Sequence, residues 1–275
     1  MKKLLIFLIA VSFAFITNAQ YVPPFEKISL NKFTVLDSAQ LRFSYNFCYK
    51  KNGINSDADT AFVVDKQSLL IGKNCSKYFS QYYFDYCEKG LERVYIHVEE
   101  GTCSFEIFKN YPANKMTVTE HAGHYILGGN MLYEEAIPDF VWKIGEDTTN
   151  ILGYTCQKAT TRFRGRNYIA WFAPEIPSNN GPWKFGGLPG IILKIYDDKR
   201  NFTFECSGMQ QLEKPEPIKF YRLNYTKLTR KKMDKIYRQL LNDPLQFWKS
   251  IHSKMAGEVT DSFKPKWTYN PIELE

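Results

Sequence analysis

Residues 181–190 constrain the fold of this chain more than any other stretch. They read Gly-Pro-Trp-Lys-Phe-Gly-Gly-Leu-Pro-Gly, with four glycines and two prolines. Glycine adopts backbone conformations that other residues avoid, and proline lacks the N–H donor that a helix or a central strand needs. We therefore predict a rigid, shaped loop, followed by a strand at the apolar residues 191–196. The end of the loop is expected to be a structural corner that sets the register of this strand: Gly187, Leu188, Pro189 and Gly190.

The amino terminus has the three parts of a cleaved signal peptide. Two lysines precede an apolar run at residues 4–16, and the segment ends at Ala19. A retained membrane anchor is the alternative, but the run is shorter than the about 20 residues that span a bilayer. We therefore expect an exported protein that is periplasmic, associated with the outer envelope or secreted, without a transmembrane segment in the mature chain. The predicted organisation is a signal peptide at 1–19, a single β-rich domain at 20–262 and a tail at 263–275.

The charge and the motif content point away from several classes of function. The sequence holds 36 basic and 29 acidic residues, and two of the lysines lie in the leader, so the mature chain is only mildly basic. Nucleic-acid binding usually requires a clustered basic face, and we predict no nucleic-acid partner. The sequence lacks a Gly-x-Ser-x-Gly elbow and a Gly-x-x-x-x-Gly-Lys phosphate loop. We predict no catalytic residue, no metal and no cofactor.

Six cysteines lie beyond the leader: Cys48, Cys75, Cys87, Cys103, Cys156 and Cys206. An even number of cysteines in an exported protein indicates disulfide bonds, and we expect three. Cys156 and Cys206 are paired by preference because both lie on late predicted strands, and the pairing of the other four stays open. A zinc site or a catalytic thiol is the alternative, but the chain has no Cys-x-x-Cys pair.

Short apolar segments with alternating residues recur along most of the chain. Residues 41–49 place an aromatic side chain at every second position, as in a half-buried strand. Further strands are predicted at 61–64 and 69–71, joined as a hairpin through 65–67, and at 94–98, 103–108, 116–119, 125–127, 131–133 and 141–144. Such a succession is typical of an antiparallel meander. The predicted fold is mainly β (α+β): a curved antiparallel sheet, as a meander or half-barrel, with a short aromatic helix and carboxy-terminal helices packed against it.

The second half of the chain gives sharper strand boundaries. The predicted order is a turn at 146–150, a strand at 154–163, a hairpin turn at 164–167 and a returning strand at 168–172. Pro174 and Pro177 end this strand because neither has a donor for the ladder. Beyond the glycine- and proline-rich loop, the strand at 191–196 is predicted to pair with one at 201–206.

Two regions have helical spacing. Aromatic residues recur every three or four positions in 76–87, and we interpret them as the core face of a short helix rather than as a ligand platform. Apolar residues from Met233 to Leu241 follow the spacing of an amphipathic helix with basic residues elsewhere on its surface. A second helix is predicted to begin at Pro244. We expect these helices to cap the sheet, and a helix lying on a membrane is the alternative.

Three groups of side chains are candidates for a site. The cations around the predicted hairpin suit a carboxylate or phosphate, although a solvated strand face is the preferred interpretation: Lys158, Arg162, Arg164 and Arg166. The large aromatic residues suit a pocket, although core packing is preferred: Trp142, Trp171, Trp183 and Phe185. His121 and His124, near Glu120, suit a metal ion, but we prefer solvated turn histidines.

The loop resembles the motif that gives the GLPGLI family its name. Residues 187–192 read Gly-Leu-Pro-Gly-Ile-Ile, with Ile191 where the family usually has leucine. Other segments also resemble the family pattern: 142–144, 151–159, 163–172, 174–177 and 181–185, with 70–73 and 76–80 upstream. The family consists of secreted proteins of Gram-negative bacteria, and the resemblance implies export, a mostly β domain and no established activity or cofactor. By architecture alone, the chain is also similar to periplasmic lipoprotein carriers, in which a curved sheet and helices enclose an apolar cavity.

Three functions are compatible with these patterns. The first is a non-catalytic binding protein of the bacterial envelope that holds an apolar or peptide-like ligand, as the aromatic content of 16% and the lack of catalytic motifs suggest. The second is a structural or interaction module that docks on another envelope protein through the loop near Trp183. The third is an unrecognised hydrolase, a hypothesis supported only by histidines and carboxylates that have no other assigned role. We predict the first function, and an enzymatic activity is not expected.

Overall fold

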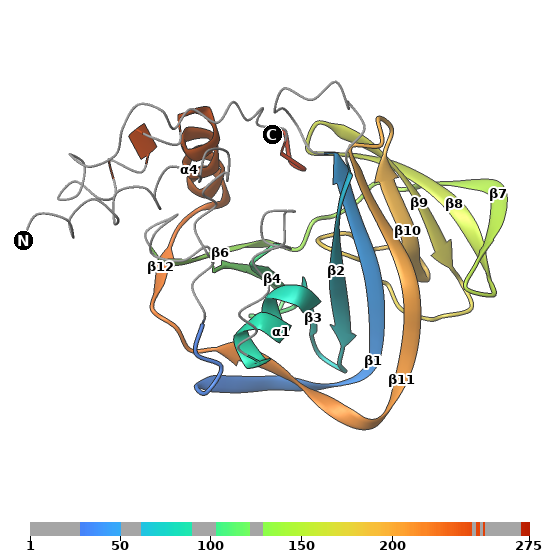
Figure 1. The fold of residues 1–275 in the computed structure, drawn as a ribbon. Helices are drawn as coiled ribbons and strands as arrows, with labels where there is room; N and C mark the ends of the chain where they lie inside the picture. The colour runs from blue at the N-terminus through green and yellow to red at the C-terminus, as the bar shows by residue number, and fades with distance from the viewer. Residues whose placement is uncertain are drawn as a thin grey trace, which may run out of the picture.

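The computed structural model describes residues 28–50, 62–89, 103–121, 129–243, 246–247, 250 and 271–275. In this part of the chain, a 12-stranded open sheet has the order β12-β6-β5-β4-β3-β2-β1-β11-β10-β9-β8-β7 (Figure 1). The elements are β1 (Phe33–Lys50), β2 (Phe62–Ile71), β3 (Ser76–Ser80), α1 (Gln81–Lys89), β4 (Phe105–Lys109), β5 (Lys115–Glu120), β6 (Asn130–Ala136), β7 (Lys143–Ile151), β8 (Tyr154–Phe163), β9 (Arg166–Ala173), β10 (Ile191–Asp197), β11 (Phe202–Tyr221), β12 (Tyr225–Lys227) and α4 (Arg230–Asn242). The predicted mainly β class is confirmed. The strand pairs are antiparallel except for β12 with β6, which corrects the expectation of a wholly antiparallel sheet.

The sheet consists of two meanders that meet at β1 and β11. Strands β1 to β6 follow one another outward on one side, and β11 to β7 do so on the other. Figure 1 shows β1 and β11 as long, bent strands running side by side, and their pairing extends from Phe33 with Tyr221 to Tyr49 with Phe202. Strand β11 continues far beyond Cys206, where the sequence predicts its end. The polar residues that follow have no apolar alternation, so only their pairing with β1 identifies them as a strand.

The predicted hairpin at residues 65–67 is wrong. These residues lie inside β2, where Asp65 and Gln67 are buried. The Asp65 carboxylate accepts a hydrogen bond from Ser80 Oγ at 2.9 Å and another from Gln67 Nε2 at 2.9 Å. Buried polar groups are tolerated when they have hydrogen-bond partners, and here a partner comes from the neighbouring strand β3.

Two other local predictions are wrong for a similar reason. Residues 76–80 form strand β3 between β2 and β4, so the helix predicted at 76–87 begins only at Gln81. Residues 146–150 belong to β7, and the turn lies instead at Leu152 and Gly153, which have φ of 54° and 85°. Pairing with neighbouring strands overrides the local signals in both segments.

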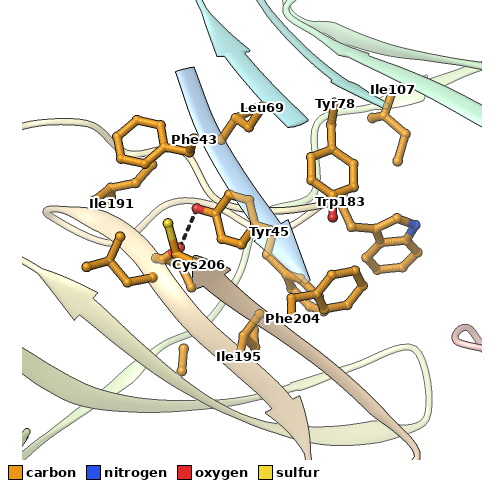
Figure 2. Close-up of a cluster of buried hydrophobic side chains, with 14 of the residues drawn as sticks. Phe43, Tyr45, Leu69, Tyr78, Ile107, Trp183, Ile191, Ile195, Phe204 and Cys206 are labelled. Atoms are coloured by element: carbon orange, nitrogen blue, oxygen red, sulfur yellow. Dashed lines mark hydrogen bonds between the residues drawn. The ribbon is translucent and has the colours of Figure 1, made fainter. Parts of the chain in front are cut away.

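The sheet carries a hydrophobic core on each face. Tyr78 belongs to one cluster and its neighbour Phe79 to the other, because successive side chains of a strand point to opposite faces. Figure 2 shows the larger cluster, in which Tyr45 and Phe204 pack near Trp183. The Tyr45 hydroxyl donates a hydrogen bond to the Ile192 carbonyl at 2.7 Å, which ties β1 to β10.

The predicted disulfide bonds do not form in the structure: among the described residues, which include all six cysteines, no cysteine sulfur is bonded to another. Cys156 and Cys206, the preferred pair, are both buried in the larger core, and each thiol contacts a nearby carbonyl of its own strand. Burial raises the pKa of Cys75, Cys156 and Cys206 to about 11. These cysteines therefore pack as small, protonated, apolar side chains.

Several predictions lie outside the described residues. They are the signal peptide at 1–19, the strands at 94–98 and 125–127, the start of the second helix at Pro244, and His124. Of the helices that the structure describes, none combines the length and the apolar content needed to cross a bilayer.

Candidate functional site

The loop at residues 181–190 is fastened to the sheet by its backbone. The Gly187 N–H donates to the Asn179 carbonyl at 2.8 Å, and the Trp142 indole N–H donates to the Gly186 carbonyl at 2.9 Å. Gly187 has a φ of 85°, a conformation that favours glycine. Trp183 and Phe185 of the loop are buried in the larger core. The loop therefore has one shape, and it places its Lys184 side chain at a fixed point beside the sheet.

Lys109 supports this loop from β4. Its ammonium donates to the Gly181 carbonyl at 2.8 Å and also to the Phe185 carbonyl. The side chain is buried, and burial lowers the pKa of Lys109 to about 7. Near neutral pH, a large share of the Lys109 side chains is therefore uncharged.

Replacing Lys109 with methionine is expected to change how stability depends on pH. The unfolded chain holds the Lys109 proton up to its ordinary pKa of about 10.5, whereas the folded protein releases it near pH 7, so the free energy of unfolding rises with pH between these values. The rise from this group is about 1.5 kcal/mol between pH 7 and 8.5. Urea unfolding at several pH values measures it, and the Lys109→Met variant should lack this increment. Equal pH dependence of the two proteins would contradict the assignment.

Three cations from separate elements surround two carboxylates beside the loop. Lys184 Nζ lies 2.7 Å from Glu135 Oε1 and 2.8 Å from Glu273 Oε1. Arg164, in the β8–β9 turn, pairs with both carboxylates, and Arg230, at the start of α4, lies 3.6 Å from Glu273 and 3.8 Å from Glu135. We call Arg164, Lys184 and Arg230 the carboxylate clamp. Burial alone would raise the pKa of Glu135, but the Lys184 ammonium and the Arg164 guanidinium hold it below its usual value.

Residues 271–275 lie across the clamp and the β8–β9 hairpin. The sequence assigns them to a tail, whereas the structure places them on the domain through contacts of their main chain. Arg166 Nη2 donates to the Pro271 carbonyl at 2.6 Å, and the Tyr168 hydroxyl donates to the Ile272 carbonyl at 3.0 Å. The Leu274 N–H in turn donates to the carbonyl of Arg164 at 3.0 Å. We call the surface that makes these contacts the peptide groove, formed by Arg164, Arg166, Tyr168, Lys184 and Arg230.

A cavity of about 260 Å³ opens beside the peptide groove. Its walls come from β4, β5 and β6, from the loop, from α4 and from the 271–275 segment, and they include Ile107, Val118, Tyr133, Trp183, Met233 and Ile272. Glu120 also lines it; burial raises the pKa of this carboxyl, which is hydrogen-bonded to Ser104 and Tyr237. The volume suits one or two aliphatic side chains better than a long acyl chain, since pockets for larger ligands span about 300 to 1,000 Å³.

The structure brings only some of the predicted cations to this site. Arg164 is partly buried, Arg166 is buried, and both have ionic partners. The solvated strand face preferred from the sequence is therefore wrong for these two residues. Arg162 is exposed, and Lys158 pairs with Asp147 on the outer side.

The aromatic candidates also divide. Trp183 lines the cavity, Phe185 is fully buried, and Trp142 holds the loop. Trp171 is only partly buried, unlike its strand neighbours Ala170 and Phe172, although it still packs against the larger core.

His121 is fully buried rather than solvated. Its Nε2 lies 2.7 Å from the Glu106 carboxylate, and its Nδ1 lies 3.1 Å from Asn130 Oδ1. Within the described ranges, no group of histidine, cysteine, aspartate and glutamate has the arrangement of a metal site.

Several residues of the site have no strong signal in the sequence. Glu135, Tyr168, Arg230 and Glu273 come from four distant segments, and no local pattern connects them. Lys184 had a usable signal, because it is the one charged residue in an otherwise apolar loop. A lone charge between Trp183 and Phe185 needs a partner once its neighbours are buried.

Comparisons with known proteins agree with the resemblance found in the sequence. Residues 163–194 match the model of a family described as a protein of unknown function (Porph_ging). The GLPGLI family is known as Porph_ging-like, so the resemblance is confirmed over this segment, which contains the β8–β9 turn, β9 and the loop. No curated protein matches the chain.

The chain is also similar to solved structures of PNGF-II in two crystal forms. For the P21 form the TM-score is 0.46 at 14% identity, and the match covers 72% of this chain and 32% of that chain. For the C2 form the TM-score is 0.43 at 14% identity, and the match covers 71% and 32%. The chain thus spans about a third of the length of the structures it matches.

Proposed function

We propose that this protein is an exported, non-catalytic binding protein of the bacterial envelope, and that its ligand is an extended peptide held in the peptide groove. The observation that carries the proposal is that residues 271–275 of the chain are themselves bound in this groove. Three of the contacts described above join the groove to main-chain atoms of this segment, and such contacts do not depend on the side chains of the bound strand. Peptide-binding domains commonly gain affinity from main-chain hydrogen bonds and specificity from neighbouring side-chain pockets.

The surroundings of the groove suit a ligand better than a reaction. Arg166 and Tyr168 lie on β9, and the clamp residues come from the β8–β9 turn, from the fastened loop and from the start of α4, so the donors are held by the fold itself. Preorganised donors reduce the entropy lost on binding. The adjoining cavity offers a place for an apolar side chain of the same ligand. An exposed extended segment of another envelope protein has this chemistry, so docking on such a protein is the form of binding that we favour.

A labelled peptide tests the proposal directly. Fluorescence anisotropy would measure binding of the peptide Asn-Pro-Ile-Glu-Leu-Glu, the sequence of residues 270–275, to the full chain. The Leu274→Pro variant removes an N–H that holds the chain's own segment, so we expect it to bind the peptide about fivefold more tightly than the parent protein does. Adding Tyr168→Phe to this variant removes one donor of the groove and should weaken binding by a similar factor. Failure of the peptide to bind any of these proteins at millimolar concentration would contradict the proposal.

A further inference from the structure

The carboxylate clamp has more positive charges than the carboxylates around it can balance, even with the 271–275 segment in place. In the structure, three cations share the carboxylates of Glu135, on β6, and Glu273, on the 271–275 segment. When the segment leaves, Glu135 is the remaining carboxylate of this cluster among the residues that the structure describes. Without the segment, the groove then holds two positive charges more than its remaining carboxylate balances.

Lys184 makes this excess costly. With the 271–275 segment in place, only 2% of its side chain is exposed; its ammonium donates to Tyr133 OH at 2.9 Å and to Glu273 Oε1 at 2.8 Å, and it lies 2.7 Å from Glu135 Oε1. Loss of Glu273 leaves one donor of a buried ammonium without an acceptor. A buried charge with an unmet partner is strongly unfavourable, so the groove favours a ligand that restores a carboxylate at this point.

The position before the carboxylate has its own preference. Ile272 lines the cavity beside Trp183 and Met233, whereas Leu274 is exposed. Glu273 lies between them in the clamp, and the backbone is held on both sides of this acidic residue, at the Ile272 carbonyl and at the Leu274 N–H. The groove therefore favours a ligand in which an aliphatic residue is followed by an acidic one.

We propose that the peptide groove is specific for extended segments of a partner protein in which an acidic residue follows an aliphatic one, and that residues 271–275 compete with this ligand for the clamp. The inference rests on the proposed function and names its substrate class. Its regulatory part follows from mass action, because a ligand binds only the fraction of molecules whose own segment has left the groove. Weakening that segment raises the apparent affinity without any change in the groove.

Two labelled peptides and two variants of the full chain test the inference. Anisotropy titrations compare Asn-Pro-Ile-Glu-Leu-Glu with Asn-Pro-Ile-Gln-Leu-Glu on the parent protein and on Glu273→Gln, which keeps the shape of the internal segment and removes its charge. We expect Glu273→Gln to bind the acidic peptide at least tenfold more tightly than the parent does. On either protein, the acidic peptide should bind about ten- to a hundredfold more tightly than its glutamine analogue, the range for charge-assisted hydrogen bonds. The matched control, Glu213→Gln, removes one exposed carboxylate on β11 and should leave both affinities unchanged.

The outcomes separate the two proposals. Equal affinity for the two peptides would overturn the specificity for a carboxylate and leave the proposed function standing. Equal binding of the acidic peptide by the parent and by Glu273→Gln would overturn the competition. If no peptide binds, both proposals fail. A dimer of the parent chain that dissociates in Glu273→Gln, measured by analytical ultracentrifugation, would overturn the assignment to a different partner, because a second copy would then supply the segment.

Discussion

Replacing Glu106 with glutamine is expected to lower the free energy of unfolding by about 3–5 kcal/mol. The carboxylate is fully buried on β4, and it lies 2.5 Å from Lys77 Nζ and 2.7 Å from His121 Nε2. The Lys77 ammonium is also enclosed by the rings of Phe79, Phe84, Phe108 and Tyr221, all within 5.3 Å. Glutamine keeps the size of the side chain but leaves this ammonium without its ionic partner. Urea unfolding followed by circular dichroism measures the loss.

Two comparisons distinguish the effect of leaving Lys77 buried without an ionic partner from the effect of removing any one carboxylate. Glu205 pairs with Lys194 at 2.9 Å on the surface, where Glu205 is 48% exposed, so Glu205→Gln should cost less than about 1 kcal/mol. The double variant Lys77→Met with Glu106→Leu removes both charges of the buried pair and should be more stable than Glu106→Gln alone. If Glu106→Gln and Glu205→Gln lie within 1 kcal/mol of each other, the pair has no special role in stability.

Replacing Gly190 with alanine is expected to destabilise the fold by about 3 kcal/mol or more. A Cβ at this position would lie 2.3 Å from the Ala173 carbonyl oxygen and 2.9 Å from the Pro174 Cα. Both are backbone atoms, and Ala173 is fixed by its pairing with Ile191 at the start of β10. Thermal and urea unfolding measure the effect, and the soluble yield reports variants that do not fold.

Gly208→Ala is the matched control for this clash. It makes the same change on β11, where a Cβ would meet no heavy atom within 4 Å, and it should alter stability by less than about 1 kcal/mol. A similar loss of unfolding free energy in the two alanine variants would show that the backbone of β9 and β10 can shift at the loop to accommodate a Cβ. Gly187→Val should also impair folding, as expected for a structural corner. Its cause is the φ of 85° rather than crowding, since the nearest atom to a Cβ there is Trp142 Nε1 at 3.7 Å.

The strands around the loop were predictable because their local signals agree with their pairing. Strand β8 has the predicted bounds, and the hairpin turn has Arg164 and Gly165 with φ of 43° and 82°, as a two-residue hairpin requires. The first meander was harder, because Asp65 and Gln67 read as a turn until their partners on neighbouring strands are known. The start of α4 has a local signal that the prediction from sequence did not use: the Thr229 side chain caps the helix by accepting from the Lys232 N–H.

The site itself was only partly visible in the sequence. Its cations were noticed around the hairpin, and Trp183 was noticed in the loop, but their partners lie on β6, on α4 and at 271–275. A single sequence reports which side chains are charged and says little about which charges meet across the fold. The same limit applies to the cysteines, whose even number indicated disulfide bonds that the structure does not contain.

The pairing of β1 with β11 also determines how the polypeptide reaches this fold. Phe33 meets Tyr221, and Leu41 meets Gln211, so the central ladder joins residues that enter the folding reaction far apart in sequence. Domains dominated by such non-local pairings fold slowly, because the entropy of closing a long loop is lost before the contacts form. Until β11 arrives, β1 presents an open edge of N–H and C=O groups to any other strand nearby. Newly made chains are therefore most exposed to aggregation in the interval between completion of the first meander and docking of the second.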